Sequence, residues 1–279
     1  MKLHTINTGY FKLDGGAMFG VVPKVIWQNI NPSDDQNLCS WAMRSLLVET
    51  GDHVVLIDTG MGNKQSDKFF SYYQPHGELT LMSSLADAGF KPEDITDVLM
   101  THLHFDHCGG SVKKDENGKL VPAFPNATYW SHVSHWAWAM NPNAREKASF
   151  LKENFVPLQE HGQLKFADET QELFPGFRVF LSSGHTECMM IPLINYKGRT
   201  VAYMADLLPS AGHIPMPYIM AYDVRPLETL EEKGRFLKTA LEKDFVLFFE
   251  HDLKNECASL KMTDRGIRAD QLFDLKTLA

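Results

Sequence analysis

The sequence has 279 residues, 44% of them hydrophobic and 22% charged, and its 35 acidic and 27 basic residues give a formal net charge of −8. This acidic balance argues against nucleic acid as a partner, because binding phosphates needs a surplus of Lys and Arg on one face. No stretch approaches the roughly 18 uninterrupted apolar residues that a membrane-spanning helix needs, and Met1–Gly20 is too polar for a signal-peptide core. We therefore expect a cytoplasmic protein that binds neither nucleic acid nor membrane.

Short apolar runs rich in β-branched and aromatic residues alternate with amphipathic stretches, which predicts strands and helices respectively. In chain order we expect a strand at His53–Ile57, a helix at Glu78–Ala88, strands at Asp97–Met100 and Ala127–Trp130, a helix at Arg145–Glu153, strands at Phe177–Leu181 and Thr200–Met204, a helix at Leu227–Lys243 and a strand at Phe245–Phe249. This alternation indicates an α/β architecture, which we expect to form one domain over residues 1–279.

Two long segments lack a regular pattern, Gly20–Asn37 and Leu207–Pro226. Loops of this length in a compact domain usually cover or line a binding site. The sequence therefore predicts that both segments serve function rather than link domains.

The densest group of chemically active side chains is in Thr101–Gly110, THLHFDHCGG, directly after a predicted strand. Imidazole and carboxylate groups hold zinc and its first-row neighbours, and we expect the two glycines to permit a tight turn. His102 and His104 should point the same way, with Asp106 and His107 facing a second position nearby. The motif therefore predicts two adjacent metal ions.

Three other predicted strands end in a single residue of metal-ligand type, at His185, Asp206 and His251. Side chains at strand ends are held by a rigid sheet. Four strand ends could therefore converge on one site.

These elements, together with the IDTG of Ile57–Gly60, resemble the metallo-β-lactamase-fold hydrolases. The resemblance covers nearly the whole chain in the correct order, and it is closest to the N-acyl-homoserine-lactone lactonase branch, in which HLHFDHxGG is a common form. It implies an αββα sandwich, with two β-sheets face to face, helices outside and the metals at one edge.

The resemblance implies seven ligands for two divalent metal ions, with zinc the favoured identity. They divide into His102, His104 and His185 on one ion, Asp106, His107 and His251 on the other, and Asp206 bridging both. Asp58 would accept hydrogen bonds around the His102–His107 turn without binding metal. Cobalt, manganese and iron also suit such nitrogen and oxygen ligands.

The implied reaction is hydrolysis of an acyl-homoserine lactone, a quorum-quenching activity, by a hydroxide that bridges the two ions. The alternatives are hydrolysis of a glyoxalase-type thioester, a β-lactam or an organophosphate triester, or a non-hydrolytic di-iron redox protein. A bridging carboxylate at Asp206 is atypical of true β-lactamases. The expected partner is a small molecule, and a homodimer remains possible.

The residues that would contact the substrate are less well defined. Many lactonases place a tyrosine three residues after the bridging aspartate, where this sequence has Pro209. Tyr218 and Tyr222 are candidates to replace it. His213 is either a further substrate contact or an ordinary loop histidine.

The segment Leu207–Tyr222 is unusually apolar for a loop, and two interpretations of it remain open. It could be a clamp that packs on the core. It could instead be a lid in which Met216 and Met220 adapt to a flexible acyl chain.

The remaining cysteines and histidines have structural interpretations. The cysteines form no CxxC pair, so we expect reduced, mostly buried thiols, with Cys108 packing behind the motif. His132 and His135 should begin an amphipathic helix that packs its tryptophans on the core. The histidines expected at the surface are His4, His53, His76 and His161.

Overall fold

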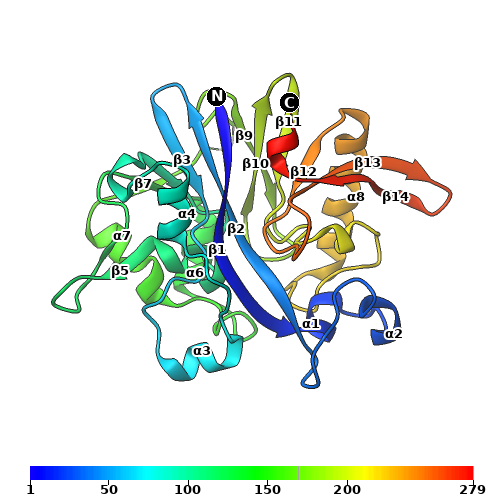
Figure 1. Cartoon of the computed structure of the whole chain (residues 1–279), viewed down its shortest axis with the longest axis horizontal. Helices are drawn as coiled ribbons and strands as arrows, with labels where there is room; N and C mark the ends of the chain where they lie inside the picture. The colour runs from blue at the N-terminus through cyan, green and yellow to red at the C-terminus, as the bar shows by residue number, and fades with distance from the viewer. Residues whose placement is uncertain (169, 279) are drawn as a thin grey trace.

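The computed structural model describes residues 1–168 and 170–278. Two six-stranded sheets face each other, with helices on their outer sides (Figure 1). The first sheet has the order β1-β2-β3-β4-β7-β8. Its strands are β1 (Lys2–Asp14), β2 (Leu38–Thr50), β3 (His53–Ile57), β4 (Asp97–Leu99), β7 (Thr128–Ser131) and β8 (Leu164–Phe166).

The second sheet has the order β14-β13-β12-β11-β10-β9, so each sheet is built from a continuous half of the chain. Its strands are β9 (Phe177–Ser182), β10 (Met189–Tyr196), β11 (Arg199–Tyr203), β12 (Val246–Phe248), β13 (Cys257–Thr263) and β14 (Gly266–Phe273). A separate two-stranded sheet pairs β5 (Val112–Lys114) with β6 (Leu120–Pro122).

The α-helices in chain order are α1 (Gly15–Phe19), α2 (Lys24–Trp27), α3 (Asp67–Tyr73), α4 (Leu81–Asp87), α5 (Phe105–Cys108), α6 (Val133–Met140), α7 (Val156–Glu160) and α8 (Pro226–Glu242). Short 3-10 turns cover Pro92–Asp94, Gly109–Ser111, Lys152–Asn154, Ala211–His213 and Leu275–Thr277. Helices α4, α6 and α7 lie beside the first sheet, and α8 lies beside the second (Figure 1). Within the described part of the chain, no helix is long and apolar enough to cross a membrane.

The inner strands of the first sheet, such as β2 and β4, are buried on both faces, to which their successive side chains point in alternation. In β2, Leu46 and Val48 enter the core between the sheets, whereas Leu47 enters the core beneath α4 and α6. This two-sided burial explains why the strand sequences are continuous apolar runs. The predicted αββα sandwich is confirmed.

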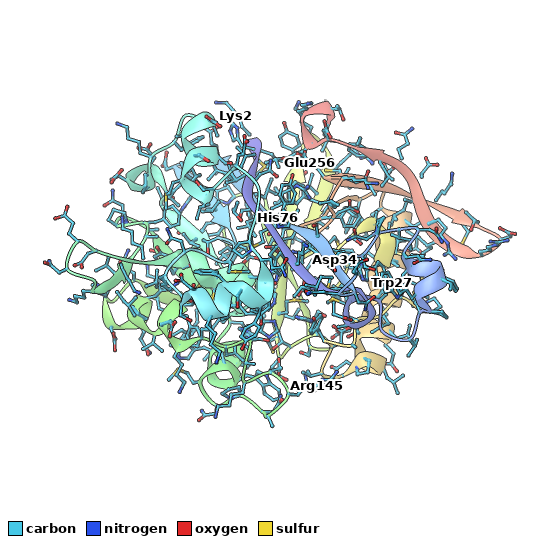
Figure 2. The ribbon with its side chains drawn as sticks, turned by 60° about the horizontal axis from the view of Figure 1, so that its bottom comes forward. Lys2, Trp27, Asp34, His76, Arg145 and Glu256 are labelled. Atoms are coloured by element: carbon cyan, nitrogen blue, oxygen red, sulfur yellow. The ribbon has the colours of Figure 1, made fainter. Side chains whose placement is uncertain are left out.

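The topology brings chemically active strand ends to one edge of the molecule. Strands β3 and β4 are parallel, as are β11 and β12, so the carboxyl ends of each pair meet at the same edge. Lys2, at the start of β1, lies at the far end of the molecule from Arg145, which lies at this edge (Figure 2).

Most of the predicted elements are confirmed, including all six strands and the helices α4 and α8. Cys39, Cys108 and Cys257 are buried and Cys188 is half-buried, and all four are free. The predicted loop Gly20–Asn37 is only partly irregular, because it contains the short helix α2.

The predicted helix Arg145–Glu153 is wrong. Residues 144–149 form turns, and only a 3-10 turn follows. The cause is Glu146, which is 3% exposed and whose Oε2 accepts hydrogen bonds from Trp138 Nε1 and Asn143 Nδ2, both at 2.7 Å. An amphipathic helix would have placed this carboxylate in solvent.

Candidate metal centre

The seven predicted ligands follow four strand ends. His102 and His104 lie between β4 and α5, and Asp106 and His107 lie in the first turn of α5. The other three ligands follow β9, β11 and β12, and they are His185, Asp206 and His251. Each half of the chain therefore supplies part of the site.

The first donor set consists of His102, His104, His185 and Asp206, which offer ligand atoms within 4.8 Å of one another. His104 Nδ1 lies 3.1 Å from His102 Nε2 and 3.2 Å from His185 Nε2. Asp206 Oδ2 lies 3.1 Å from His185 Nε2. The structure thus brings together the three histidines predicted to share one ion.

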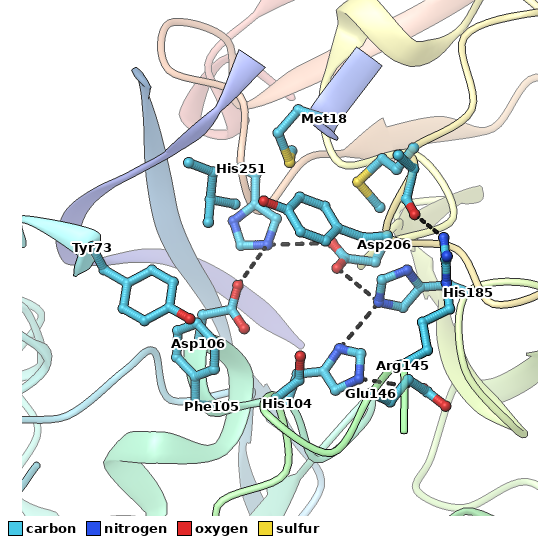
Figure 3. Close-up of a pocket in the computed structure, with 15 residues that line it drawn as sticks. Met18, Tyr73, His104, Phe105, Asp106, Arg145, Glu146, His185, Asp206 and His251 are labelled. Carbon is cyan, nitrogen blue, oxygen red and sulfur yellow. Dashed lines mark hydrogen bonds and ion pairs between the residues drawn. The ribbon is translucent and has the colours of Figure 1, made fainter. Parts of the chain in front are cut away.

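The second donor set consists of Asp106, His107 and His251. His251 Nε2 lies 3.2 Å from His107 Nε2 and 3.8 Å from Asp106 Oδ2. Asp206 reaches this set too, with Oδ1 3.3 Å from His251 Nε2 and Oδ2 3.5 Å from His107 Nε2. Asp206 therefore lies between the two sets (Figure 3).

These residues fit divalent metal ions on two grounds. Asp206 Oδ1 is buried and has no hydrogen-bond partner among the described residues, and a buried carboxylate oxygen needs a compensating donor or cation. Imidazole nitrogens such as His102 Nε2 and His104 Nδ1, 3.1 Å apart, repel unless a proton or a cation lies between them. Nitrogen and carboxylate donors are those that zinc and neighbouring metals accept.

Asp58 orients two of the rings from behind, as predicted. Its Oδ2 accepts from Thr101 Oγ1 at 2.6 Å and from His107 Nδ1 at 3.1 Å. Since the Thr101 hydroxyl donates to Asp58, it accepts from His102 Nδ1, 3.1 Å away. Both rings therefore donate through Nδ1 and direct Nε2 into the donor sets.

The other rings are held in the same way. His185 Nδ1 donates to Asp223 Oδ1 at 2.8 Å, and His251 Nδ1 donates to the Ala42 carbonyl at 2.7 Å. His104 is reversed, because its Nδ1 faces the donor set and its Nε2 lies 3.5 Å from Glu146 Oε1. Each ring is thus fixed by a partner outside the donor sets.

The histidine rings differ in pKa according to the charges around them. Burial lowers the pKa of both His102 and His104, which are therefore neutral at neutral pH. Burial also acts to lower the pKa of His185, but Asp206 and Asp223 outweigh it and raise that pKa to about 10. Burial is likewise outweighed at His107, whose pKa is raised well above its ordinary value chiefly by Glu250. The same negative charges that favour the protonated form of His185 and His107 would favour a metal cation in place of these protons.

The glycines after the motif lie in the predicted tight turn, a 3-10 turn over Gly109–Ser111, but close packing rather than backbone freedom requires them there. Gly109 has φ −60°, which any residue adopts. A Cβ on Gly109 would lie 2.1 Å from the Met61 carbonyl oxygen, and a Cβ on Gly110 would lie 2.3 Å from that of Thr59. The motif therefore packs directly against the chain that follows Asp58.

Left-handed backbone occurs at two non-glycine positions of the site. Asp58 has φ 56°, and Ala205, directly before Asp206, has φ 42°. Such conformations persist only where the surrounding structure holds them, and they concentrate at functional sites. The carboxylates of Asp58 and Asp206 are thus positioned by strained backbone, at Asp58 itself and at Ala205.

A cavity of about 300 Å³ opens above the donor sets (Figure 3). Its floor contains His104, Asp106, His185, Asp206 and His251, and its walls contain Leu13, Met18, Tyr73, Phe105, Arg145, Glu146, Ser149, Met220, Ala221 and Tyr222. The walls thus combine large apolar side chains with two phenol groups and a guanidinium group.

The candidates for substrate contact lie in different places. Tyr222 lines the cavity, whereas Tyr218 packs on the core around Phe19. His213 is 1% exposed, and its ring nitrogens lie 2.8 Å from Ser210 Oγ and 2.9 Å from the Met18 carbonyl oxygen. Of these three residues, only Tyr222 is positioned beside the donor sets.

Several residues around the site were missed by sequence reasoning. Tyr73 and Arg145 line the cavity, while Glu146, Asp223 and Glu250 lie behind the histidines. Apart from Glu250, each of these residues stands outside any motif, so no local pattern marks it. Glu250 could have been noticed, because it ends an apolar run directly before His251. A glutamate that is buried at such a position usually has a charged partner.

Comparison with known proteins agrees with this geometry. The metallo-beta-lactamase superfamily model matches residues 44–251. An N-acyl homoserine lactonase of Bacillus cereus is 23% identical over 268 residues, covering 91% of this chain and 94% of the relative. A structure described as a probable metal-dependent hydrolase from Staphylococcus aureus is 30% identical, covers 100% of this chain and 98% of its own, and has a TM-score of 0.89. A dizinc quorum-quenching lactonase in complex with a product is 24% identical, with 98% and 95% coverage and a TM-score of 0.79.

The match from residue 44 to residue 251 spans all seven residues of the two donor sets. The chain belongs to the metallo-beta-lactamase superfamily of hydrolases.

Proposed function

We propose that this protein opens the lactone ring of N-acyl-homoserine lactones with the help of two divalent metal ions. The observation that carries the proposal is the position of Asp206 between two donor sets, on the floor of a cavity with apolar and hydroxyl-bearing walls. Metal ions bound there would supply hydroxide at neutral pH and polarise a carbonyl oxygen. The lactonases among the relatives support this choice of substrate.

Two phenol groups in the cavity could donate hydrogen bonds to the substrate. Burial and the nearby Asp106 raise the pKa of Tyr73 to about 12, and burial raises the pKa of Tyr222 as well. Both hydroxyl groups therefore keep their protons at neutral pH. Tyr222 is the better placed of the two sequence candidates to take the part of the tyrosine that Pro209 replaces.

The apolar wall suits an acyl chain. Met18 and Met220 line the cavity, and both are almost fully buried. Leu207, Leu208 and Ile214 instead pack in the core between the sheets. These positions support a clamp for the first part of the segment and an acyl-binding wall for its end.

The test compares the metal-loaded protein on four substrate classes: acyl-homoserine lactones of graded chain length, a thioester, a β-lactam and a phosphotriester. We expect the lactones to be preferred and their catalytic efficiency to rise with chain length, by a factor of about four for each methylene buried. A preference for another class, or equal efficiency for all lactones, would contradict the proposal.

A variant at Met220 examines the wall directly. Met220→Glu places a charge in the apolar wall, so it should reduce efficiency on long-chain lactones more than on short ones. Met262→Glu is the matched control, since Met262 is 63% exposed on β13 and away from the cavity. An equal loss on all lactones in Met220→Glu would argue against acyl binding at this wall.

A further inference from the structure

A buried lysine on α8 contacts the segment that forms one wall of the cavity. We call Pro215–Tyr222 the wall segment, because its end, from Met220 to Tyr222, lines the cavity. Lys233 is 0% exposed. Its Nζ donates to the carbonyl oxygens of Pro215 at 2.8 Å, Tyr218 at 3.0 Å and Met216 at 3.4 Å. The hydrogen-bond donors of this amino group are thus directed at one stretch of backbone.

The wall segment needs such a partner because it forms neither helix nor strand. Pro215 and Pro217 cannot donate backbone hydrogen bonds, and buried carbonyl groups without partners are costly. The amino group of Lys233 donates hydrogen bonds to all three of these carbonyl oxygens. A leucine or methionine at position 233 would be cheaper to bury but would remove the donor of the Met216 and Tyr218 carbonyls, while the Pro215 carbonyl would keep the Tyr218 amide alone.

The surface of α8 is also shaped to receive the segment. Gly234 lies in the middle of α8, where glycine weakens a helix. A Cβ there would lie 3.2 Å from Met216 Cε, so the glycine lets Met216 pack against the helix. Lys233 and Gly234 together fix the beginning of the wall segment.

The far end of the segment is held by other contacts. The Ala221 amide donates to the Ala17 carbonyl at 2.8 Å, and the Arg145 guanidinium donates to the carbonyl oxygens of Ala221 and Asp223. Between these contacts and Lys233, Met220 has little freedom to move away from the cavity. The position of the apolar wall therefore depends on attachment at both ends.

We propose that Lys233 is a positioning residue that sets substrate specificity: by holding the carbonyls of Pro215, Met216 and Tyr218, it fixes how far the Met220–Tyr222 wall stands from the metal centre. Lys233 touches neither the donor sets nor the cavity, so it acts through the wall segment. The part of this inference that concerns acyl-chain length rests on the proposed lactonase function, whereas the part that concerns the order of the wall does not.

The experiment compares Lys233→Met, which keeps the length of the side chain but removes its donors, with Lys238→Met on the same helix. The Lys238 side chain is 76% exposed, so its replacement serves as the control. Hydrogen exchange is followed in peptides that contain the Ile219 and Ala221 amides, and metal content is measured in parallel. We expect exchange there to become at least about tenfold faster in Lys233→Met, with unchanged metal content and no change in the control.

Kinetics on lactones of graded chain length provide the second readout. In Lys233→Met we expect KM for long-chain lactones to rise several-fold while kcat on the shortest lactone stays near that of the wild type. Unchanged exchange in the wall segment would overturn the proposal, as would an equal loss of kcat on all lactones accompanied by loss of metal. If the wild type lacks lactonase activity while exchange still accelerates in the variant, the proposed function fails and the role of Lys233 in ordering the wall stands.

A second variant keeps the proposal testable if Lys233→Met does not fold. Lys233→Gln keeps two amide donors but is too short to reach all three carbonyls. We expect it to accelerate exchange in the wall segment by a smaller factor. Exchange at the wild-type rate in this variant would also contradict the proposal.

Discussion

Asp223 offers the sharpest test of how the candidate centre would hold a metal ion. It lies in the irregular segment before α8, is 1% exposed, and accepts a hydrogen bond of 2.8 Å from His185 Nδ1. Asp223→Ala removes this acceptor and leaves the buried His185 ring free to rotate or to change its tautomer. Asp223→Asn retains an acceptor oxygen but loses the negative charge.

The expected magnitude follows from this one contact. A hydrogen bond to a charged group contributes about 1.5 to 3 kcal/mol, and loss of a partner that orients a metal ligand lowers metal affinity about 10- to 100-fold. That range corresponds to about 1.4 to 2.7 kcal/mol, so the two estimates agree. We expect Asp223→Ala near the upper end and Asp223→Asn near the lower end.

The measurement is competition for Zn²⁺ between the protein and a chromophoric chelator. Asp252→Asn is the matched control, because Asp252 is similarly buried beside His251 but, among the described residues, its carboxylate accepts from the backbone amides of Ala211, Lys254 and Asn255 and the side-chain amide of Asn255 rather than from a histidine ring. Its replacement should lower stability without changing Zn²⁺ affinity. Wild-type affinity in Asp223→Ala would refute the idea that this carboxylate orients His185.

Three further predictions follow from the same geometry. Asp206→Asn should keep its far-UV circular dichroism but lose turnover by orders of magnitude, since a neutral amide bridges two cations poorly; a variant that retains most activity would exclude the bridging role. Gly110→Ala should lower the free energy of unfolding by about 2 to 3 kcal/mol, because its Cβ would lie 2.3 Å from a backbone oxygen. The control Gly118→Ala should lower it by about 1 kcal/mol, because there the only strain is the positive φ. Equal losses for the two variants in denaturant titrations would count against close packing at Gly110. Zn²⁺ binding at pH 7 should release protons, because the raised pKa of His185, about 10, keeps that ring protonated without metal. Apparent affinity should therefore increase with pH, and calorimetry in buffers of different ionisation enthalpy would detect the protons or their absence.

The convergence of the ligands could be predicted from the sequence because each group of ligands follows an apolar strand, whereas their full division into two sets came from the family resemblance. His185, Asp206 and His251 are far apart in the chain, yet β-strand patterns are local and their carboxyl ends gather at one edge. The hydrogen bonds of Asp58 were expected only from the family resemblance, and the structure shows the strand β3, which precedes Asp58, paired with β4, which leads into His102.

The residues that support the ligands could not be predicted, since they are defined only by tertiary contacts. Glu146 lies in the wrongly predicted helix Arg145–Glu153, and only its burial beside His104 and Trp138 reveals that its carboxylate turns inward. Similarly, Lys233 matches the pattern of an amphipathic helix, and nothing local indicates that its charge faces three carbonyls.

Because each sheet is built from a continuous half of the chain, the ligands of the candidate metal centre emerge at different stages of synthesis. The first sheet ends at Phe166 and the second begins at Phe177, so a growing chain presents His102, His104, Asp106 and His107 well before their partners emerge. Domains generally fold as whole units during synthesis, so the first sheet is not expected to complete its folding before the second sheet has emerged. The newly made half therefore carries a partial ligand set, and tight capture of metal must wait until the second sheet docks. Metal loading would then report the last stage of assembly, and any ion held by both halves would add its binding free energy to the contact between the two sheets.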